Sequence, residues 1–350
     1  MGNFLFDIGI IGAGSWGTAI ASLLSHNKHR ITLWAYENEV CKHIANHREN
    51  HIYLPGIPIP DLVMPTQSFR EACTNKDFLI SAVPSHLTRP IMSKCAPCLD
   101  DRTIIVSLSK GIENETLKLM SGVFEDILPK NFYSQIAFLS GPSFATEVAQ
   151  HLPTAVVVAS VNQGIAEKVQ QVFATSFFRV YTSNDIIGVE LGGALKNVIA
   201  IAAGCADGLG FGHNTRAALI TRGLAEILRL GIKAEANPLT FSGLSGLGDL
   251  VLTCTGALSR NRSVGIKLGE GMTLEKIVAS SKMVAEGIKT TKSAFQLAQH
   301  LKVDMPIVEQ VYKIIYHNKD PRQAVTDLMG RSLRYELDAD LHNGNASILK

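Results

Sequence analysis

Residues Ile186–Cys205 read IIGVELGGALKNVIAIAAGC, and this stretch decides how the rest of the chain folds. It is long enough for several helical turns, and Asn184 and Asp185 before it are residue types that cap helix N-termini. Its apolar residues lie on every face, which is typical of a helix buried all round. A buried ammonium group must be paired, change its pKa or face a polar cavity. This stretch contains Lys196, for which two interpretations are open. In the first, its ammonium group reaches solvent or pairs with Glu190. In the second, it is a catalytic or ligand-binding lysine at a cleft.

The composition describes a compact globular protein. The chain has 350 residues, enough for about two domains. Hydrophobic residues make up 46% and charged residues 18%, which excludes bulk disorder. The net charge of +2 is too small to indicate a nucleic acid partner. We expect no signal peptide and no integral membrane association, because no apolar run free of polar breaks reaches spanning length.

The six cysteines are scattered along the chain. Cys95-Ala-Pro-Cys98 is a single C-x-x-C pair with no second pair to complete a zinc site. We therefore expect no metal, and we interpret the cysteines as reduced thiols of a cytoplasmic protein.

A glycine loop near the start of the chain predicts a dinucleotide site. The apolar run Phe6–Ile11 reads as a strand, Gly12-Ala13-Gly14-Ser15-Trp16-Gly17 follows it, and Thr18–Leu24 continues as a helix. In this context the first glycine permits a tight turn, the second lets the backbone approach a pyrophosphate, and the third allows close packing. The N–H groups at the helix start would face the phosphates. The alternative is a plain glycine-rich turn.

The second strand leaves the choice between NAD and NADP open. Arg30–Ala35 reads as this strand, and an NAD site commonly ends it with Asp or Glu to hold the ribose. This chain has Tyr36 there and Glu37 one place later.

Strands alternate with helical stretches up to about residue 185. This alternation predicts an α/β fold with a doubly wound Rossmann-type sheet. Ligands bind beyond the carboxyl ends of such strands, where the glycine loop, Lys110 and the loop Ser140–Ala145 are expected. The remaining predicted strands are 77–84, 103–109, 135–139, 154–159 and 179–181, with a helix over 165–174 and a turn-rich loop over 50–56.

After Asp185 the pattern is helical, which predicts an all-helical C-terminal domain. The predicted helices include 215–230, 274–279, 286–299 and 306–316. We place a dinucleotide-binding domain at 1–188, a helical substrate and catalytic domain at 189–335, and a loose tail at 336–350.

Two segments of the helical half contain polar groups suited to a small anion. Gly243–Leu250 is dense in glycine and includes Asp249, which could instead favour a helix dipole. Ser259-Arg260-Asn261, followed by Arg262, could be a solvated face. Hydroxyl, guanidinium and amide together also suit a phosphate monoester.

Several motifs, taken in their order, resemble a known family. They are Gly12–Gly17, Ser109-Lys110-Gly111, Ser140-Gly141-Pro142-Ser143, Leu191–Asn197 and Gly246–Leu250. From about residue 6 to 335 the chain resembles the bacterial NAD(P)-dependent sn-glycerol-3-phosphate dehydrogenases. The resemblance implies reversible reduction of dihydroxyacetone phosphate with NAD or NADP, feeding phospholipid synthesis. It also implies a soluble, often dimeric enzyme, so we expect a cytoplasmic homodimer that binds a small phosphorylated substrate.

The resemblance also implies roles for individual residues. Lys196 matches the proton donor and acceptor. Substrate contacts are implied at Lys110, Gly141, Ser143, Lys196, Asp249, Ser259, Arg260 and Asn261. Cofactor contacts are implied at Gly12, Gly14, Ser15, Trp16, Gly17, Tyr36, Tyr53, Lys110, Ala145, Arg260, Val284 and Glu286. Tyr36 departs from the family pattern, in which many members carry His or Arg.

Two other functions stay open on sequence grounds. A β-hydroxyacid dehydrogenase shares the glycine-loop sheet, the helical domain and the lysine, although the segments Gly246–Asp249 and Ser259–Asn261 argue against it. A non-catalytic dinucleotide-binding module is the second alternative, since a glycine loop alone would suffice for it.

Overall fold

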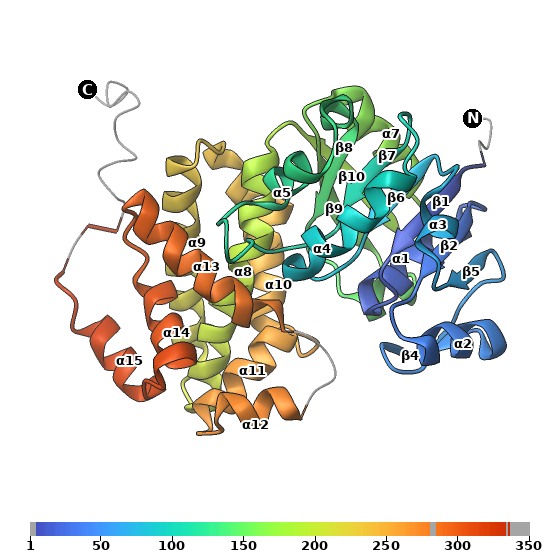
Figure 1. Cartoon of the computed structure of the whole chain (residues 1–350). Helices are drawn as coiled ribbons and strands as arrows, with labels where there is room; N and C mark the ends of the chain where they lie inside the picture. Colours follow the sequence, from blue (N-terminus) through green and yellow to red (C-terminus); the bar gives the residue numbers. More distant parts are fainter. Residues whose placement is uncertain (1–4, 281–284, 334, 337–350) are drawn as a thin grey trace.

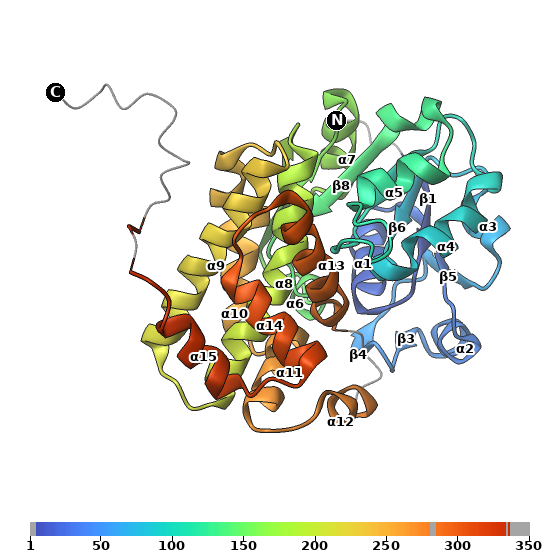
Figure 2. The ribbon, with the colours of Figure 1, turned by 60° about the vertical axis from the view of Figure 1, so that its left-hand side comes forward.

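The computed structural model describes residues 5–280, 285–333 and 335–336, and it has two bodies side by side (Figures 1 and 2). The first is an open sheet with helices on both faces. The second contains helices and, within the described residues, no strand, with α8 (Ile186–Gly208) in its middle. The predicted fold class, a Rossmann-type sheet followed by a helical domain, is confirmed.

The main sheet has eight strands in the order β10-β9-β8-β7-β6-β1-β2-β5. From β5 to β8 all neighbours are parallel, β9 is antiparallel to β8, and β10 is parallel to β9. The chain changes direction across the sheet between β1 and β6, the point where such sheets bind ligands. The strands are β1 (Asp7–Ile11), β2 (Arg30–Trp34), β5 (Val63–Thr66), β6 (Phe78–Ser81), β7 (Ile104–Ser107), β8 (Ile136–Ser140), β9 (Thr154–Ala159) and β10 (Phe178–Ser183).

Strand side chains alternate between two apolar cores. Ile8 and Ile10 of β1 join the core that includes α1 and α7, whereas Ile11 joins the core that includes α3, α4 and α5. Because both faces are covered, the inner strands β6, β7 and β8 are buried at every position and are apolar except for a final serine in each. The helices are α1 (Ser15–His26), α2 (Asn38–His47), α3 (Phe69–Cys73), α4 (Ser85–Cys95), α5 (Met120–Ile127), α6 (Ala145–Ala149) and α7 (Gln163–Phe173).

Two parts of this body differ from the sequence prediction. Residues 50–56 are not simply a loop, because β3 (Glu49–Asn50) and β4 (Leu54–Pro58) pair antiparallel around a turn. Strand β5 was missed, since Val-Met-Pro-Thr contains a proline that disfavours a strand. Its place at the sheet edge explains why Pro65 is tolerated there.

The helical body is arranged around α8. Asp185 caps this helix as predicted, because its Oδ1 accepts a hydrogen bond from the Gly188 N–H at 2.9 Å. Helix α8 packs against α9, α10, α11, α13 and α14. The helices are α9 (His213–Lys233), α10 (Asp249–Thr255), α11 (Arg260–Gly269), α12 (Leu274–Ala279), α13 (Glu286–Leu301), α14 (Pro306–His317) and α15 (Pro321–Met329).

Glycines bring α8 and α11 into backbone contact. A Cβ on Gly204 would lie 2.1 Å from the Arg262 carbonyl oxygen, and one on Gly265 would lie 2.1 Å from the Ile201 carbonyl oxygen. Such distances leave no room for any side chain, so glycine is required on both helices at this crossing.

Within the described part of the chain, α8 is the one helix long and apolar enough to span a membrane. Most of its apolar window, 83%, is buried inside the protein. Its apolar composition is therefore explained by its place in the core.

Candidate functional site

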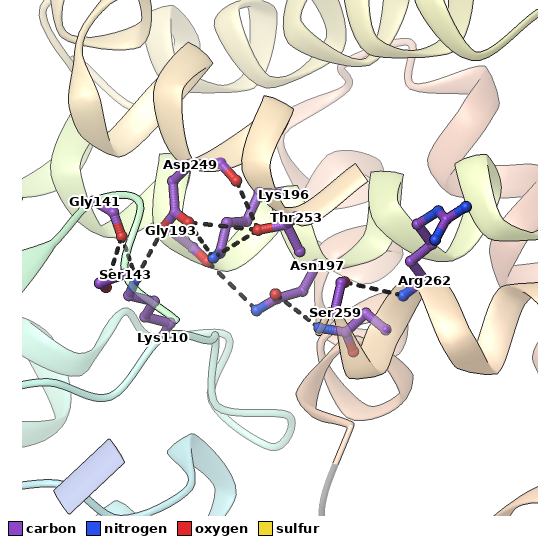
Figure 3. Close-up of polar contacts among 11 residues, drawn as sticks. Lys110, Gly141, Ser143, Gly193, Lys196, Asn197, Asp249, Thr253, Ser259 and Arg262 are labelled. Carbon is purple, nitrogen blue, oxygen red and sulfur yellow. Dashed lines mark hydrogen bonds and ion pairs between the residues drawn. The ribbon is translucent and has the colours of Figure 1, made fainter. Parts of the chain in front are cut away.

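The carboxylate of Asp249 lies between two lysines that come from different bodies of the molecule (Figure 3). Lys196 Nζ on α8 is 2.5 Å from Asp249 Oδ1, and Lys110 Nζ is 2.8 Å from Asp249 Oδ2. Asp249 is 0% exposed and Lys196 is 8% exposed. A buried carboxylate needs such partners, and here it holds both ammonium groups at one point.

Local structure explains how each of these side chains reaches the site. Lys110 follows β7 at the carboxyl edge of the sheet, where ligand-binding loops are expected. Asp249 is the first residue of α10 and follows the helical turn Leu244–Gly248 without a break. Thr253 stands four residues later on the same helix, and its Oγ1 accepts a hydrogen bond from Lys196 Nζ at 2.9 Å. The sequence did not identify Thr253 as a site residue, although its spacing from Asp249 placed it on the same helix face.

Burial lowers the pKa of Lys196 to about 8. Desolvation is the largest cause, Asp249 opposes it, and the charge of Lys110 lowers the pKa further. An amine with this pKa can both give and take a proton near neutral pH.

The loop after β8 completes the sheet side of the site. Gly141 has φ +132°, and a Cβ there would lie 2.9 Å from Val156 Cα, so glycine is required. Its carbonyl oxygen accepts hydrogen bonds from Lys110 Nζ at 3.0 Å and from Ser143 Oγ at 3.0 Å. The structure thus brings together Lys110, Gly141, Ser143, Lys196 and Asp249, five of the residues for which the resemblance implies substrate contacts.

The segment Ser259–Asn261 lies at the start of α11. Ser259 caps this helix, since its Oγ accepts a hydrogen bond from the Arg262 N–H at 3.2 Å. Asn261 is buried; its Nδ2 donates to Asn197 Oδ1 at 2.8 Å and its Oδ1 accepts from the Gly287 N–H at 2.9 Å. Arg260 is exposed. Figure 3 shows the Arg262 side chain pointing away from Lys196, and its Nε donates to Asp207 Oδ2 at 2.8 Å.

The glycine loop fits a dinucleotide. A Cβ on Gly14 would meet no atom within 4 Å, so the backbone there is open to a ligand. A Cβ on Gly17 would lie 1.9 Å from the Gly12 carbonyl oxygen, which explains the third glycine by close packing. No side chain caps α1, and the buried Trp16 Nε1 has no hydrogen-bond partner. Free N–H groups at the start of α1 are what a pyrophosphate requires.

The other residues implied in cofactor binding are placed as follows. Ser15 begins α1, and Ala145 packs with Trp16 against the same small apolar cluster. Tyr36 is 75% exposed beyond the end of β2. Tyr53 donates its hydroxyl to Glu37 Oε1 at 2.8 Å, and burial together with Glu37 raises the pKa of Tyr53 to about 12.

Glu286 lies at the start of α13, and its Oε1 accepts a hydrogen bond from the Ser85 N–H at 2.9 Å. Burial raises the pKa of Glu286, while the charges of Arg260, Lys110 and Lys196 lower it. Val284 lies outside the described residues.

The pairing of Lys196 with Glu190, one of the interpretations of the sequence, is wrong. The Glu190 carboxylate binds Ser121 instead. Lys196 lies six positions after Glu190, so helical geometry directs the two side chains to different faces.

Histidine, cysteine, aspartate and glutamate side chains form no group of three or more that could hold a metal ion in the described ranges. All six cysteines are free thiols.

Comparison with known families identifies both bodies. Residues 7–166 match the model described as NAD-dependent glycerol-3-phosphate dehydrogenase N-terminus, and residues 185–326 match the model of its C-terminus. The chain belongs to this family. A glycerol-3-phosphate dehydrogenase [NAD(P)+] from Syntrophotalea carbinolica is 54% identical over 95% of this chain and 100% of its own length. The relative of that name from Myxococcus xanthus is 52% identical over 94% of this chain and 98% of its own length.

A solved structure agrees with this assignment. Glycerol-3-phosphate dehydrogenase from Coxiella burnetii is 39% identical, with a TM-score of 0.89 over 93% of this chain and 99% of that chain. This protein is therefore an NAD(P)-dependent oxidoreductase of the glycerol-3-phosphate dehydrogenase family.

Proposed function

We propose that the chain interconverts dihydroxyacetone phosphate and sn-glycerol 3-phosphate with NAD(P)H and supplies glycerol 3-phosphate for phospholipid synthesis. The observation that carries the proposal is the buried Lys196, held with Lys110 on the single carboxylate of Asp249. This arrangement places a titratable donor where the sheet and the helical body meet.

The chain's own residues provide the acid–base chemistry. Reduction of a ketone leaves negative charge on its oxygen, which needs a positioned donor. Lys196 gives that oxygen a proton from Nζ and takes it back in the reverse direction. Asp249 and Thr253 hold the ammonium group in place, and Lys110 adds positive charge beside it. The nicotinamide, when bound, supplies the hydride.

Arg260 is proposed to bind the phosphate. Ser259 already caps α11, and Asn261 already bonds Asn197 and Gly287. Their remaining capacity for a ligand is small, whereas the Arg260 guanidinium is exposed at the first residue of α11. A planar fork at a helix N-terminus suits a phosphate dianion.

The remaining proposals concern organisation. We propose a dinucleotide-binding domain at 1–188, a helical domain at 189–335 and a cytoplasmic homodimer. Residues 336–350 were expected to be a loose tail, and of these only 336 lies within the described part.

NADH and NADPH oxidation with dihydroxyacetone phosphate, followed by absorbance, tests the function. We expect turnover with this ketone and none with a 3-hydroxy acid in the oxidative direction. Turnover of the 3-hydroxy acid alone would favour a β-hydroxyacid dehydrogenase. Cofactor binding without oxidation under any substrate would favour a binding module.

A further inference from the structure

Glu190 is a buried carboxylate on the same helix as Lys196, and it caps a different helix. Its Oε1 accepts a hydrogen bond from the Ser121 N–H at 2.9 Å, and its Oε2 accepts one from Ser121 Oγ at 2.5 Å. Ser121 lies in the first turn of α5, whose own N-cap residue, Leu119, provides no side-chain acceptor. Glu190 therefore satisfies N–H groups at a helix start that local sequence leaves open.

This cap joins the two bodies of the molecule. Helix α5 follows β7 and packs on the sheet, while α8 is the central helix of the helical body (Figure 1). Lys110 lies on the connection between β7 and α5. The hydrogen bonds of Glu190 consequently tie the segment that carries Lys110 to the helix that carries Lys196.

A second close contact holds α8 against the sheet. A Cβ on Gly193 would lie 2.6 Å from Ser140 Oγ at the end of β8. The helix thus touches the sheet at Gly193 and α5 at Glu190. Glu190 lies about 9 Å before Lys196 along the axis of α8, and its side chain is on a different face of that helix. Any effect of Glu190 on the position of Lys196 is therefore transmitted through α8 itself.

We propose that Glu190 is a positioning residue for the proton transfer. By capping α5, it fixes the position of Lys196 relative to Lys110. The inference rests on the proposed function. Catalytic groups must be held within about 0.5 Å of their productive geometry. A misplacement of about 1 Å can cost about 10²-fold in rate. Loss of the cap would loosen the contact between the two bodies, where Lys110 and Lys196 both bind Asp249.

The chain offers a matched control in Glu226. This residue is 1% exposed on α9, and its carboxylate caps α14 through the N–H groups of Ile307 at 2.7 Å and Val308 at 3.1 Å. Burial raises the pKa of Glu190 and that of Glu226 to about 7 in each case. Both glutamates therefore cap a helix from a buried position, but the hydrogen bonds of Glu226 join two helices of the helical body, α9 and α14.

The experiment compares Glu190→Ala, Glu190→Gln and Glu226→Ala with wild type, using dihydroxyacetone phosphate and NADH from pH 6 to 10. We measure kcat/KM against pH, the affinity for NADH and the melting temperature. Glu190→Ala should lower kcat/KM by more than about tenfold. It should also move the alkaline limb to higher pH, because the charge of Lys110 is one cause that lowers the pKa of Lys196.

Glu190→Gln should restore most of the rate, since its amide oxygen still accepts the Ser121 N–H. NADH affinity should stay near the wild-type value in every variant. Glu226→Ala should lower the melting temperature without moving the alkaline limb. If Glu190→Ala does not fold, Ser121→Ala decides, with a severalfold loss and the same shift of the limb expected.

A wild-type rate and limb in Glu190→Ala, or in Ser121→Ala where that variant decides, would overturn the inference and leave the proposed function standing. Equal changes in Glu226→Ala would also overturn it, because they would reduce Glu190 to a general stabilising role. Wild type inactive with dihydroxyacetone phosphate would overturn the proposed function and this inference together.

Discussion

Helices α8 and α9 are neighbours of similar length, yet they differ in how they use polar residues. Along α8 each buried polar side chain bonds another element: Glu190 bonds α5, Lys196 bonds α10 and Asn197 bonds α11. On α9 the cation Lys233 is exposed, and Glu226 is the buried charged residue. A charged side chain on a helix buried all round therefore needs a specific partner, whereas on a half-exposed helix a charged side chain such as that of Lys233 can remain in solvent.

We expect the largest effect from replacing the buried Lys196 of α8, and none from replacing the exposed Lys233 of α9. Lys196→Met keeps the stem volume and removes the proton donor, so the chemical step should fall by about 10²–10⁴-fold. The melting temperature should equal or exceed that of wild type, because a desolvated charge is removed while Asp249 keeps Lys110. Single-turnover NADH oxidation, NADH affinity and thermal melting measure these effects. Lys233→Met on α9 is the control and should change none of them; chemistry retained in Lys196→Met would make Lys196 a structural cation.

Arg260, the first residue of α11, has an exposed guanidinium, unlike the buried Lys196 of α8. Arg260→Ala should reduce kcat/KM for dihydroxyacetone phosphate by the equivalent of about 1.5–3 kcal/mol, the contribution of a hydrogen bond to a charged group. Arg260→Lys should recover part of this loss, because lysine is a point charge rather than a fork. Free dihydroxyacetone should be a poor substrate that the substitution hardly affects. Equal losses for both substrates would show that Arg260 acts on the fold or the cofactor.

Helix α8 has one close glycine contact with α11 and another with α9, and the two differ in what the glycine touches. Gly265→Ala on α11 would place a Cβ 2.1 Å from the backbone oxygen of Ile201, whereas Gly223→Ala on α9 would place one 2.5 Å from the Ile199 side chain. Both substitutions gain similar helix propensity, so their difference reports the contact. Gly265→Ala should destabilise the protein by about 1–3 kcal/mol, and Gly223→Ala by less, because a side chain yields more easily than backbone. Urea unfolding measures both, and the reverse order would contradict the rigid α8–α11 contact.

The fourth prediction uses pH to test the buried lysine. Reduction needs protonated Lys196, so kcat/KM for the ketone should fall above its pKa of about 8, approaching tenfold per pH unit. Oxidation of glycerol 3-phosphate needs the neutral amine and should rise up to the same pH. Parallel profiles in the two directions would exclude Lys196 as the shared acid and base.

The smallest expected effect lies outside α8, at the end of β2. Tyr36 offers no charge to a 2′-phosphate, and the Glu37 carboxylate beside Tyr53 would repel one. We expect NADH to be used at least comparably with NADPH. Specificity constants for the two cofactors decide this. A preference for NADPH above about a hundredfold, close to 3 kcal/mol, would contradict it.

Local patterns were sufficient for most of the fold. Short apolar runs located the main strands, with a glycine loop after β1 and β8 and a proline after β6, and the uniform hydrophobicity of residues 186–205 identified a core helix. The edge strand β5 was missed because Pro65 obscured it, and only its neighbour β2 makes it a strand.

The candidate site was only partly accessible from sequence. Lys196 stood out as a cation among apolar residues, but its partner Asp249 is 53 positions away and no local rule pairs them. The link between Glu190 and Ser121 spans 69 positions and depends on how the two bodies pack. Such long-range pairings follow from tertiary packing, which a single sequence does not specify residue by residue.

The backbone contact between α8 and α11 has a consequence for hydrogen exchange. Amides between Val198 and Cys205 lie on a largely buried helix, against a second backbone with no side chain between them at the glycine contacts. Such amides exchange with solvent only when the whole domain opens, so they should be among the slowest in the protein. Lys196 lies two positions before this segment on the same helix, so activity in rising urea should persist until global unfolding begins.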